Sequence, residues 1–119
     1  MREIKFRAWI NKIGKWADQI LIAEGGGFIA YSIAIDYRNA ELEQYTGLKD
    51  KHGREIYEGD IVAADSWNPA NFEIQFIEGG FCGWRDDIGI PTDINMWFDS
   101  LGCHITVIGN VHENPELLN

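Results

Sequence analysis

The residues best suited to metal binding or nucleophilic chemistry are two cysteines and three histidines. None of their spacings matches a CxxC or HxxxH pattern, and neighbouring residues on a strand point to opposite faces, which separates Cys103 from His104. We therefore expect no metal site and no cofactor. Cys82 and Cys103 are interpreted as small buried hydrophobes that stay reduced as free thiols, because the amino end lacks an export signal.

Other catalytic patterns are equally incomplete. The glycine triplet Gly25–Gly27 lacks the Lys and Ser/Thr of a phosphate-binding loop, and no serine lies in a GxSxG turn. Asp86 and Asp87 are adjacent and point apart, which disfavours a carboxylate pair sharing a proton. We predict that the protein is not an enzyme. A hydrolase with an acidic metal site near Asp60 is kept as a third hypothesis, although an aspartate that accepts hydrogen bonds from turn amides is commoner.

The amino-terminal segment offers one candidate surface for single-stranded nucleic acid. Residues 1–16 carry a formal charge of +4, and two of the chain's five tryptophans lie among these cations. Because tryptophan stacks on bases and cations attract phosphates, the candidate contacts are Arg2, Lys5, Arg7, Trp9, Lys12, Lys15 and Trp16. Trp9 shares a strand face with Lys5 and Arg7, so partial exposure is expected for it. The favoured alternative is that the tryptophans fill the core of a small β protein.

The charge of the whole chain argues against duplex DNA as a partner. Ten Lys or Arg oppose nineteen Asp or Glu, which gives a formal charge of −9 and a pI near 4.6. Residues 55–119 hold one Arg and twelve acids. Duplex binding depends on cations that neutralise several phosphates. This balance favours a solvated acidic surface or a surface that selects a basic partner.

Length and hydropathy predict a single domain over residues 1–119, with one core. No apolar run exceeds four residues, so no membrane-spanning helix is expected. The opening alternates charged and apolar residues and does not resemble a signal peptide. We therefore expect a cytoplasmic protein that does not associate with membranes.

Alternation of apolar and polar residues dominates the chain and predicts β-strands. The ambiguous stretches are Asp36–Glu43, a loop or helical turn, and Ile94–Leu101, irregular or a short helix. Pro115 begins a short terminal helix that docks Leu117 and Leu118. Seven or eight short strands predict an all-β fold, a mainly antiparallel small barrel or sandwich. The strands are expected over Ile4–Trp9, Trp16–Ala23, Phe28–Ile35, Glu41–Thr46, Ile61–Ala64, Phe72–Ile77, Phe81–Trp84 and Ile105–Val111.

Three segments resemble the YopX-like family of bacteriophage and prophage proteins. The most specific is QYTGLKDKHGREIYEGDIV, residues 44–62. The opening REIKFRAW and the closing VIGNVHENPELL resemble the ends of the family's sequences, so that about a third of the chain lies in clear motif. Departures are small: His52 stands where Asn is usual, and Val111-His112 where Ile-Tyr is usual.

The resemblance implies a small, mostly β protein from a phage or prophage gene expressed in a bacterial cytoplasm. It implies no activity and no catalytic residues. The residues of the motif themselves predict a structural hairpin, in which turns at Gly53 and Gly59 flank a short strand around Ile56, and Asp60 accepts hydrogen bonds from turn amides. Its apolar residues are expected to be mainly buried: Tyr45, Leu48, Ile56, Tyr57, Ile61 and Val62.

The leading functional hypothesis is a non-enzymatic protein-interaction module that binds a host or phage protein. The alternative is a binder of single-stranded nucleic acid through the amino-terminal basic and aromatic residues. Whether the chain also associates with copies of itself is left open.

Overall fold

The computed structural model describes residues 3–22, 25, 28–32, 35–37, 40–65 and 70–118. Within these ranges it has fourteen β-strands and two short 3-10 helices, and all strand pairs are antiparallel. Contacts divide the chain into two compact units, Glu3–Gln44 and Tyr45–Asn119. Arg2 and most of the glycine triplet lie outside the described residues.

The first unit contains two small sets of paired strands. Strand β1 (Phe6–Ile10) pairs with β2 (Lys15–Trp16) through a turn in which the Gly14 amide donates to the Ile10 carbonyl oxygen, and on its other side with the start of β6 (Ala40–Lys49). Strands β3 (Gln19–Ile22), β4 (Phe28–Ser32) and β5 (Ile35–Tyr37) form a separate three-stranded sheet. Ala8 and Ile10 form the buried centre of this unit.

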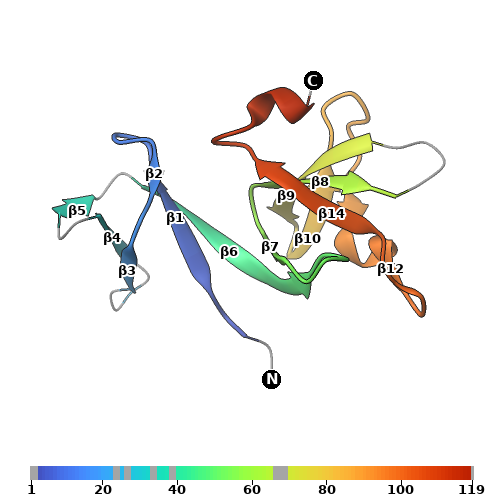
Figure 1. The fold of residues 1–119 in the computed structure, drawn as a ribbon, viewed down its shortest axis with the longest axis horizontal. Helices are drawn as coiled ribbons and strands as arrows, with labels where there is room; N and C mark the ends of the chain where they lie inside the picture. Colours follow the sequence, from blue (N-terminus) through green and yellow to red (C-terminus); the bar gives the residue numbers. More distant parts are fainter. Residues whose placement is uncertain are drawn as a thin grey trace. The chain divides into compact units, whose positions relative to one another are not determined.

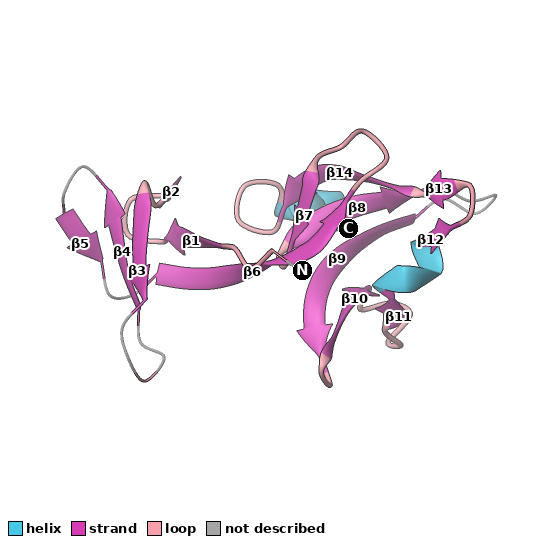
Figure 2. Cartoon of the chain, turned by 90° about the horizontal axis from the view of Figure 1, so that it is seen from below, coloured by secondary structure: helices cyan, strands magenta, loops and turns pink. Residues whose placement is uncertain are grey.

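The second unit is built on a five-stranded sheet in the order β11-β10-β9-β8-β14. Figure 2 shows that its longest strand, β9, is strongly curved. The end of β6 pairs separately with β7 in the hairpin of residues 45–57. The strands of the sheet are β8 (Asp60–Ala64), β9 (Ala70–Ile77), β10 (Gly80–Trp84), β11 (Thr92–Asp93) and β14 (Ile105–Asn110), with β7 at Glu55–Tyr57 and a small hairpin of β12 (Phe98–Asp99) and β13 (Gly102–Cys103) (Figure 1).

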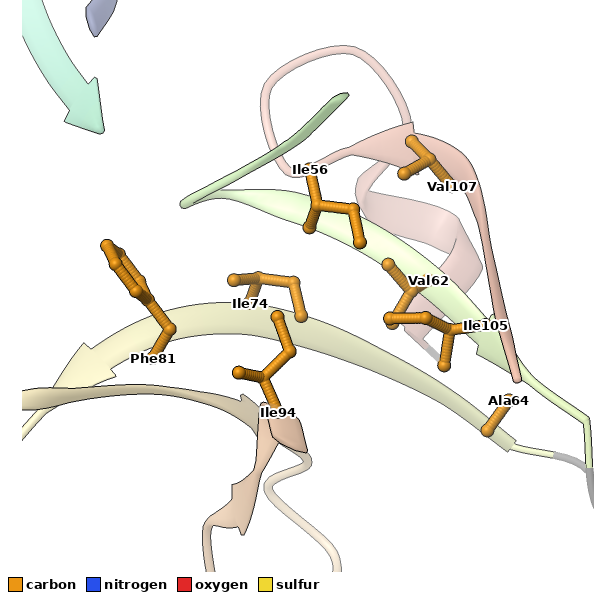
Figure 3. Close-up of a cluster of buried hydrophobic side chains, with 8 residues drawn as sticks. All are labelled: Ile56, Val62, Ala64, Ile74, Phe81, Ile94, Ile105 and Val107. Carbon is orange, nitrogen blue, oxygen red and sulfur yellow. The ribbon is translucent and has the colours of Figure 1, made fainter. Parts of the chain in front are cut away.

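The main core of the second unit lies on the concave sheet and is almost entirely aliphatic. Figure 3 shows its eight side chains, with Phe81 and Ala64 at opposite ends of the cluster. Leu48 and Trp97 pack against it from the edge. Each unit has its own apolar cluster, whereas the length of the chain predicted a single core. The prediction of a single domain stays a prediction, because compact units need not fold independently.

The predicted all-β, mainly antiparallel class is confirmed, but the strands are shorter and more numerous than expected. The return strand at Trp16–Ala23 is interrupted: β2 ends at Trp16, the chain bends at Asp18, and β3 begins at Gln19. Phe28–Ile35 ends as a strand at Ser32. The ambiguous Asp36–Glu43 contains strand residues of β5 and β6, and Ile94–Leu101 contains helix η1 (Ile94–Trp97) followed by β12.

The carboxyl end forms the expected short helix, η2 (Pro115–Leu118), of the 3-10 type. Leu117 and Leu118 are half-buried, and the Asn71 side-chain amide of β9 donates to the Leu117 carbonyl oxygen at 2.9 Å. This hydrogen bond and the half-buried leucines hold the helix against β9, as predicted.

Candidate functional site

The charged turn of the 44–62 motif is held together by one buried carboxylate, Asp50. Its Oδ1 accepts hydrogen bonds from the amides of His52 and Arg54, both at 2.9 Å, and its Oδ2 accepts one from the Val107 amide at 2.9 Å. Burial alone raises the pKa of Asp50, but these three amides outweigh it and hold the pKa below its usual value. Asp50 therefore ties the motif turn to the outer edge of β14.

The rest of the motif is also structural. Asp60 is buried, and its Oδ2 accepts a hydrogen bond from the Tyr57 amide at 2.8 Å, as predicted. The turn glycines Gly53 and Gly59 have φ values of +82° and +86°. Of the six apolar residues expected to be mainly buried, Leu48 and Tyr57 are half-buried and the other four are buried. The predicted structural hairpin is confirmed.

Beside this hairpin, the second unit has an open hollow of about 540 Å³, here called the hairpin groove. Leu48, Phe81 and Ile94 line it, and Phe81 and Ile94 are also members of the main core, in which Figure 3 labels them. The groove brings together the end of β6, the β9–β10 turn and the start of η1. Its described lining is Thr46, Gly47, Leu48, Phe76, Gly79, Gly80, Phe81, Asp93, Ile94 and Asn95.

The β9–β10 turn forms the rim of the groove. Phe76, at the end of β9, is 51% exposed and packs edge-on against Phe81, with ring centroids 5.1 Å apart. Glu78 has a φ of +50°, a left-handed conformation rarely adopted by residues other than glycine and asparagine. A second hollow of about 300 Å³ on this turn includes Glu78 and shares Gly79, Gly80, Phe81 and Asp93 with the groove. Phe81 is paired with Phe76, whereas Cys82 is paired with Gln75 and Asp93, so the groove lies toward one face of β10 and the second hollow toward the other.

The polar side chains that line these hollows bond to neighbouring groups of the chain. Thr46 Oγ1 donates to the Ile56 carbonyl oxygen at 2.8 Å and accepts from the Leu48 amide at 3.2 Å. Asp93 is the single charged residue in the described lining of the groove, and its Oδ1 accepts from both the backbone and side-chain nitrogens of Asn95. In the second hollow, burial and the nearby charge of Asp93 raise the pKa of the Cys82 thiol. A thiol with a raised pKa is a poor nucleophile at neutral pH.

The candidate nucleic-acid contacts near the amino terminus lie in the first unit, except Arg2, which is outside the described residues. Lys12 and Lys15 are exposed. Trp9 is only 8% exposed, so the expected partial exposure was wrong: it packs edge-on against Trp16 across the β1–β2 pair, at 5.0 Å between ring centroids.

Two further cations of this set already contact other groups of the chain. The Arg7 guanidinium lies 4.3 Å from the centroid of the Trp16 ring, and its Nε donates to Glu43 Oε1 at 2.9 Å. Lys5 pairs with Glu3 at 3.6 Å. The structure thus brings Arg7, Trp9 and Trp16 together, but in a packed cluster with the neighbouring strand residue Glu43.

Both cysteines are free thiols, Cys82 buried and Cys103 half-buried. Burial raises the pKa of the Cys103 thiol, as it does for Cys82. His104 Nε2 lies 2.9 Å from Asp99 Oδ2. The two thiols instead contact backbone carbonyl oxygens, Cys82 that of Gln75 and Cys103 that of Ile105. Among the described residues, no group of three or more His, Cys, Asp or Glu is placed to hold a metal ion.

Sequence reasoning missed the groove, although it identified most of the segments that form it. Phe72, Ile74 and Phe76 alternate with Glu73 and Gln75, which predicts one apolar strand face, yet of these three only Ile74 is buried. A signal was available in the position of Phe76 at the end of its strand, directly before a Glu-Gly-Gly turn. Aromatic residues at such strand ends extend beyond the packed part of a sheet.

The strand order and core define a small, mainly antiparallel β protein. The chain belongs to the YopX protein family, whose sequence profile matches residues 5–119. The resemblance found in the sequence is therefore confirmed at the level of the family.

Two solved structures are similar over their full lengths and over all of this chain. Protein EF1440 from Enterococcus faecalis matches with a TM-score of 0.68 and 26% identity, and protein yopX from Bacillus subtilis with a TM-score of 0.61 and 25% identity. A comparison with curated protein sequences found no match. In the described part of the chain, no helix has the length and apolar character needed to cross a membrane.

Proposed function

We propose that this protein is a non-enzymatic protein-interaction module that binds its partner through the hairpin groove. We further propose that it is a phage or prophage accessory protein acting in the bacterial cytoplasm on a host or phage protein. The observation that carries the proposal is the half-exposed Phe76 ring at the mouth of an apolar groove, beside the structural motif of the family.

The composition of the groove supports binding of a polypeptide. Large apolar side chains, with aromatic rings prominent among them, contribute most of the affinity in protein interfaces. Phe76, Phe81 and Leu48 supply such surface, while the glycines of the β9–β10 turn leave the backbone accessible to a partner. The groove is seated on a β-hairpin and a core, and such rigid elements hold a binding surface in place.

The polar groups of the groove support the same proposal. The Thr46 hydroxyl is engaged with backbone groups of the motif hairpin, and one oxygen of Asp93 is engaged with Asn95. Thr46 therefore fixes the shape of the groove. Asp93 keeps its second carboxylate oxygen for a partner, because only Oδ1 is engaged by Asn95.

The proposal is tested by affinity capture from infected or prophage-bearing bacterial cells, comparing the unaltered protein with Phe76→Ser. Because Phe76 is half-exposed, this change removes the apolar contact while leaving the core intact. We expect the unaltered protein to retain a specific protein after nuclease treatment and Phe76→Ser to lose it. The control variant is Leu101→Ser, which removes a large exposed apolar side chain that does not line the groove.

Two results would overturn the proposal. One is a partner that is retained equally by the unaltered protein and by Phe76→Ser. The other is captured material that disappears on nuclease treatment, which would instead favour single-stranded nucleic acid as the ligand.

A further inference from the structure

We propose that the occupant of the hairpin groove is an extended segment of a partner protein that alternates large apolar residues with Lys or Arg. This inference rests on the proposed function and names the chemistry of its partner. An apolar side chain of the segment would contact Phe76, Leu48 and Ile94, and the flanking cations would approach Asp93 and Glu78.

Two carboxylates beside the groove support a basic partner. Asp93 is exposed and lines both hollows, and Glu78 is exposed and lines the second hollow, so cations that alternate with apolar residues on an added strand would face them. Asp93 Oδ2 and the Glu78 carboxylate accept no hydrogen bond and form no ion pair with the described residues. A cation on a bound segment would find both carboxylate groups available, since only Asp93 Oδ1 is occupied.

Three of the four cations at residues 45–119 contact other groups of the chain. Lys51 pairs with Asp65, and Arg85 forms a two-point ion pair with Asp87 at 2.9 and 2.8 Å. Arg54 donates to the Val107 carbonyl oxygen at 3.1 Å. The fourth, Lys49, is exposed at the end of β6, next to Leu48. The charge balance is nevertheless negative, because residues 45–119 carry thirteen acids against four Lys or Arg. Complementary charge of this kind selects partners and speeds their association.

The strand arrangement favours an extended segment. Strand β11 is the end strand of the five-stranded sheet as described, and it pairs with β10 only at Cys82 and Gly83. The chain then leaves the sheet at Ile94, where η1 begins. Strand β11 therefore does not extend along Gly80 and Phe81 of β10, and these two residues line the groove. Addition of a strand beside an exposed sheet edge is a common mode of peptide recognition, with side-chain pockets giving specificity.

The test is a fluorescence anisotropy titration with three labelled peptides of equal length. In the first, leucines alternate with lysines. The second has glutamate in place of lysine, and the third has serine in place of leucine. We expect the first peptide to bind, its affinity to fall with added salt, and both other peptides to bind at least about tenfold more weakly.

Matched variants locate the binding. Glu78→Gln combined with Asp93→Asn should weaken the lysine–leucine peptide about two- to twenty-five-fold, since each exposed charge pair accounts for a factor of about 1.5 to five. Asparagine keeps the helix-capping oxygen at position 93, so the fold is preserved. Phe76→Ser should weaken it about tenfold. The control Glu116→Gln removes an equally exposed charge that lines neither hollow and should leave affinity unchanged.

Equal binding of the lysine and glutamate peptides would overturn the inference, as would equal weakening by Glu116→Gln and by the combined Glu78→Gln and Asp93→Asn variant. If the peptides fail to bind while Phe76→Ser still abolishes capture of the cellular partner, the inference fails and the proposed function stands. If the peptides bind as expected but Phe76→Ser leaves cellular capture unchanged, the proposed function fails, and the groove's preference for basic, apolar segments stands.

Discussion

At the scale of single residues, the most informative group is the Asp50 carboxylate. A charged turn such as KDKHG invites an interpretation as a binding loop, because charged residues gather there. Instead, three backbone amides from two separate segments surround the Asp50 oxygens. The role of Asp50 is therefore to hold the 44–62 hairpin to β14.

The first prediction concerns Asp50→Asn. An amide at this position replaces one acceptor oxygen with a donor, so a backbone amide loses its partner, and we expect a loss of about 1–3 kcal/mol in the free energy of unfolding. Urea unfolding at neutral pH measures it. Unchanged stability would contradict the structural role of Asp50, and Glu116→Gln is the control.

The pH dependence of the same protein follows from the lowered pKa of Asp50. The unfolded state binds a proton at Asp50 more readily than the folded state does. The stabilisation is therefore fully present above the ordinary aspartate pKa of about 3.9 and is lost as the pH falls from there through the folded pKa. The free energy of unfolding is measured between about pH 5 and pH 3. As the pH is lowered, it should fall less steeply for Asp50→Asn than for the unaltered protein.

The second prediction concerns the close approach of Trp97 to β10. A Cβ atom at Gly83 would lie 2.2 Å from Trp97 Cη2 and 3.1 Å from Phe72 Cβ. Gly83→Ala must displace the Trp97 ring, and we expect a loss of about 1–3 kcal/mol. Gly80→Ala on the same strand is the control, because a Cβ there meets nothing within 4 Å. Equal melting temperatures for the two variants would refute this packing.

At the scale of elements, the β9–β10 hairpin combines an unfavourable turn residue with the exposed rim of the groove. Glutamate at a φ of +50° is strained relative to asparagine, which together with a following glycine is typical of tight hairpin turns. The strain is tolerated at a position where, in our proposal, the carboxylate meets a partner.

The third prediction follows from this turn. Glu78→Asn should stabilise the protein by about 0.5–1 kcal/mol, since asparagine adopts the left-handed conformation more readily. The same change should weaken the lysine–leucine peptide, because the carboxylate is lost. Thermal unfolding and the anisotropy titration measure the two effects, and a variant that is destabilised would show that the turn requires glutamate for structural reasons.

The elements differ in how far the sequence could predict them. The motif hairpin was predictable because its turns depend on local chemistry, with glycine at positive φ and Asp60 bonded three residues back to Tyr57. The exposure of Phe76 and the burial of Trp9 were not predictable. Alternation gives the two faces of a strand, but which face is covered depends on the side chains that pack there, such as Trp16 of the paired strand β2 against Trp9.

The groove itself was beyond prediction for the same reason. Its walls come from Thr46–Leu48, the β9–β10 turn and Asp93–Asn95, which meet only through long-range strand pairing. The strands expected over Glu41–Thr46, Phe72–Ile77 and Phe81–Trp84 reach into these segments, and Ile94–Leu101 was expected to be irregular or a short helix. Their convergence into one concave surface is a property of the tertiary structure.

At the scale of the whole molecule, the separation of charge sets the class of partner. The fourth prediction is that the protein has no measurable affinity for duplex DNA at about 150 mM salt, where the Debye length is about 8 Å. Residues 55–119 hold one Arg against twelve acids, and Arg7 already pairs with Glu43 in the first unit. Anisotropy titration with a labelled duplex measures this, and micromolar binding that weakens with salt would refute it.

The central claim, that the hairpin groove is the partner-binding surface, is tested most directly by photo-crosslinking in living cells. The photoreactive amino acid benzoylphenylalanine is placed in prophage-bearing bacteria at Phe76, and in a parallel strain at Leu101, which is more exposed but does not line the groove. Our account predicts a discrete protein adduct with the probe at Phe76 and none at Leu101. Adducts of equal yield at both positions, or an adduct at Leu101 alone, would contradict it.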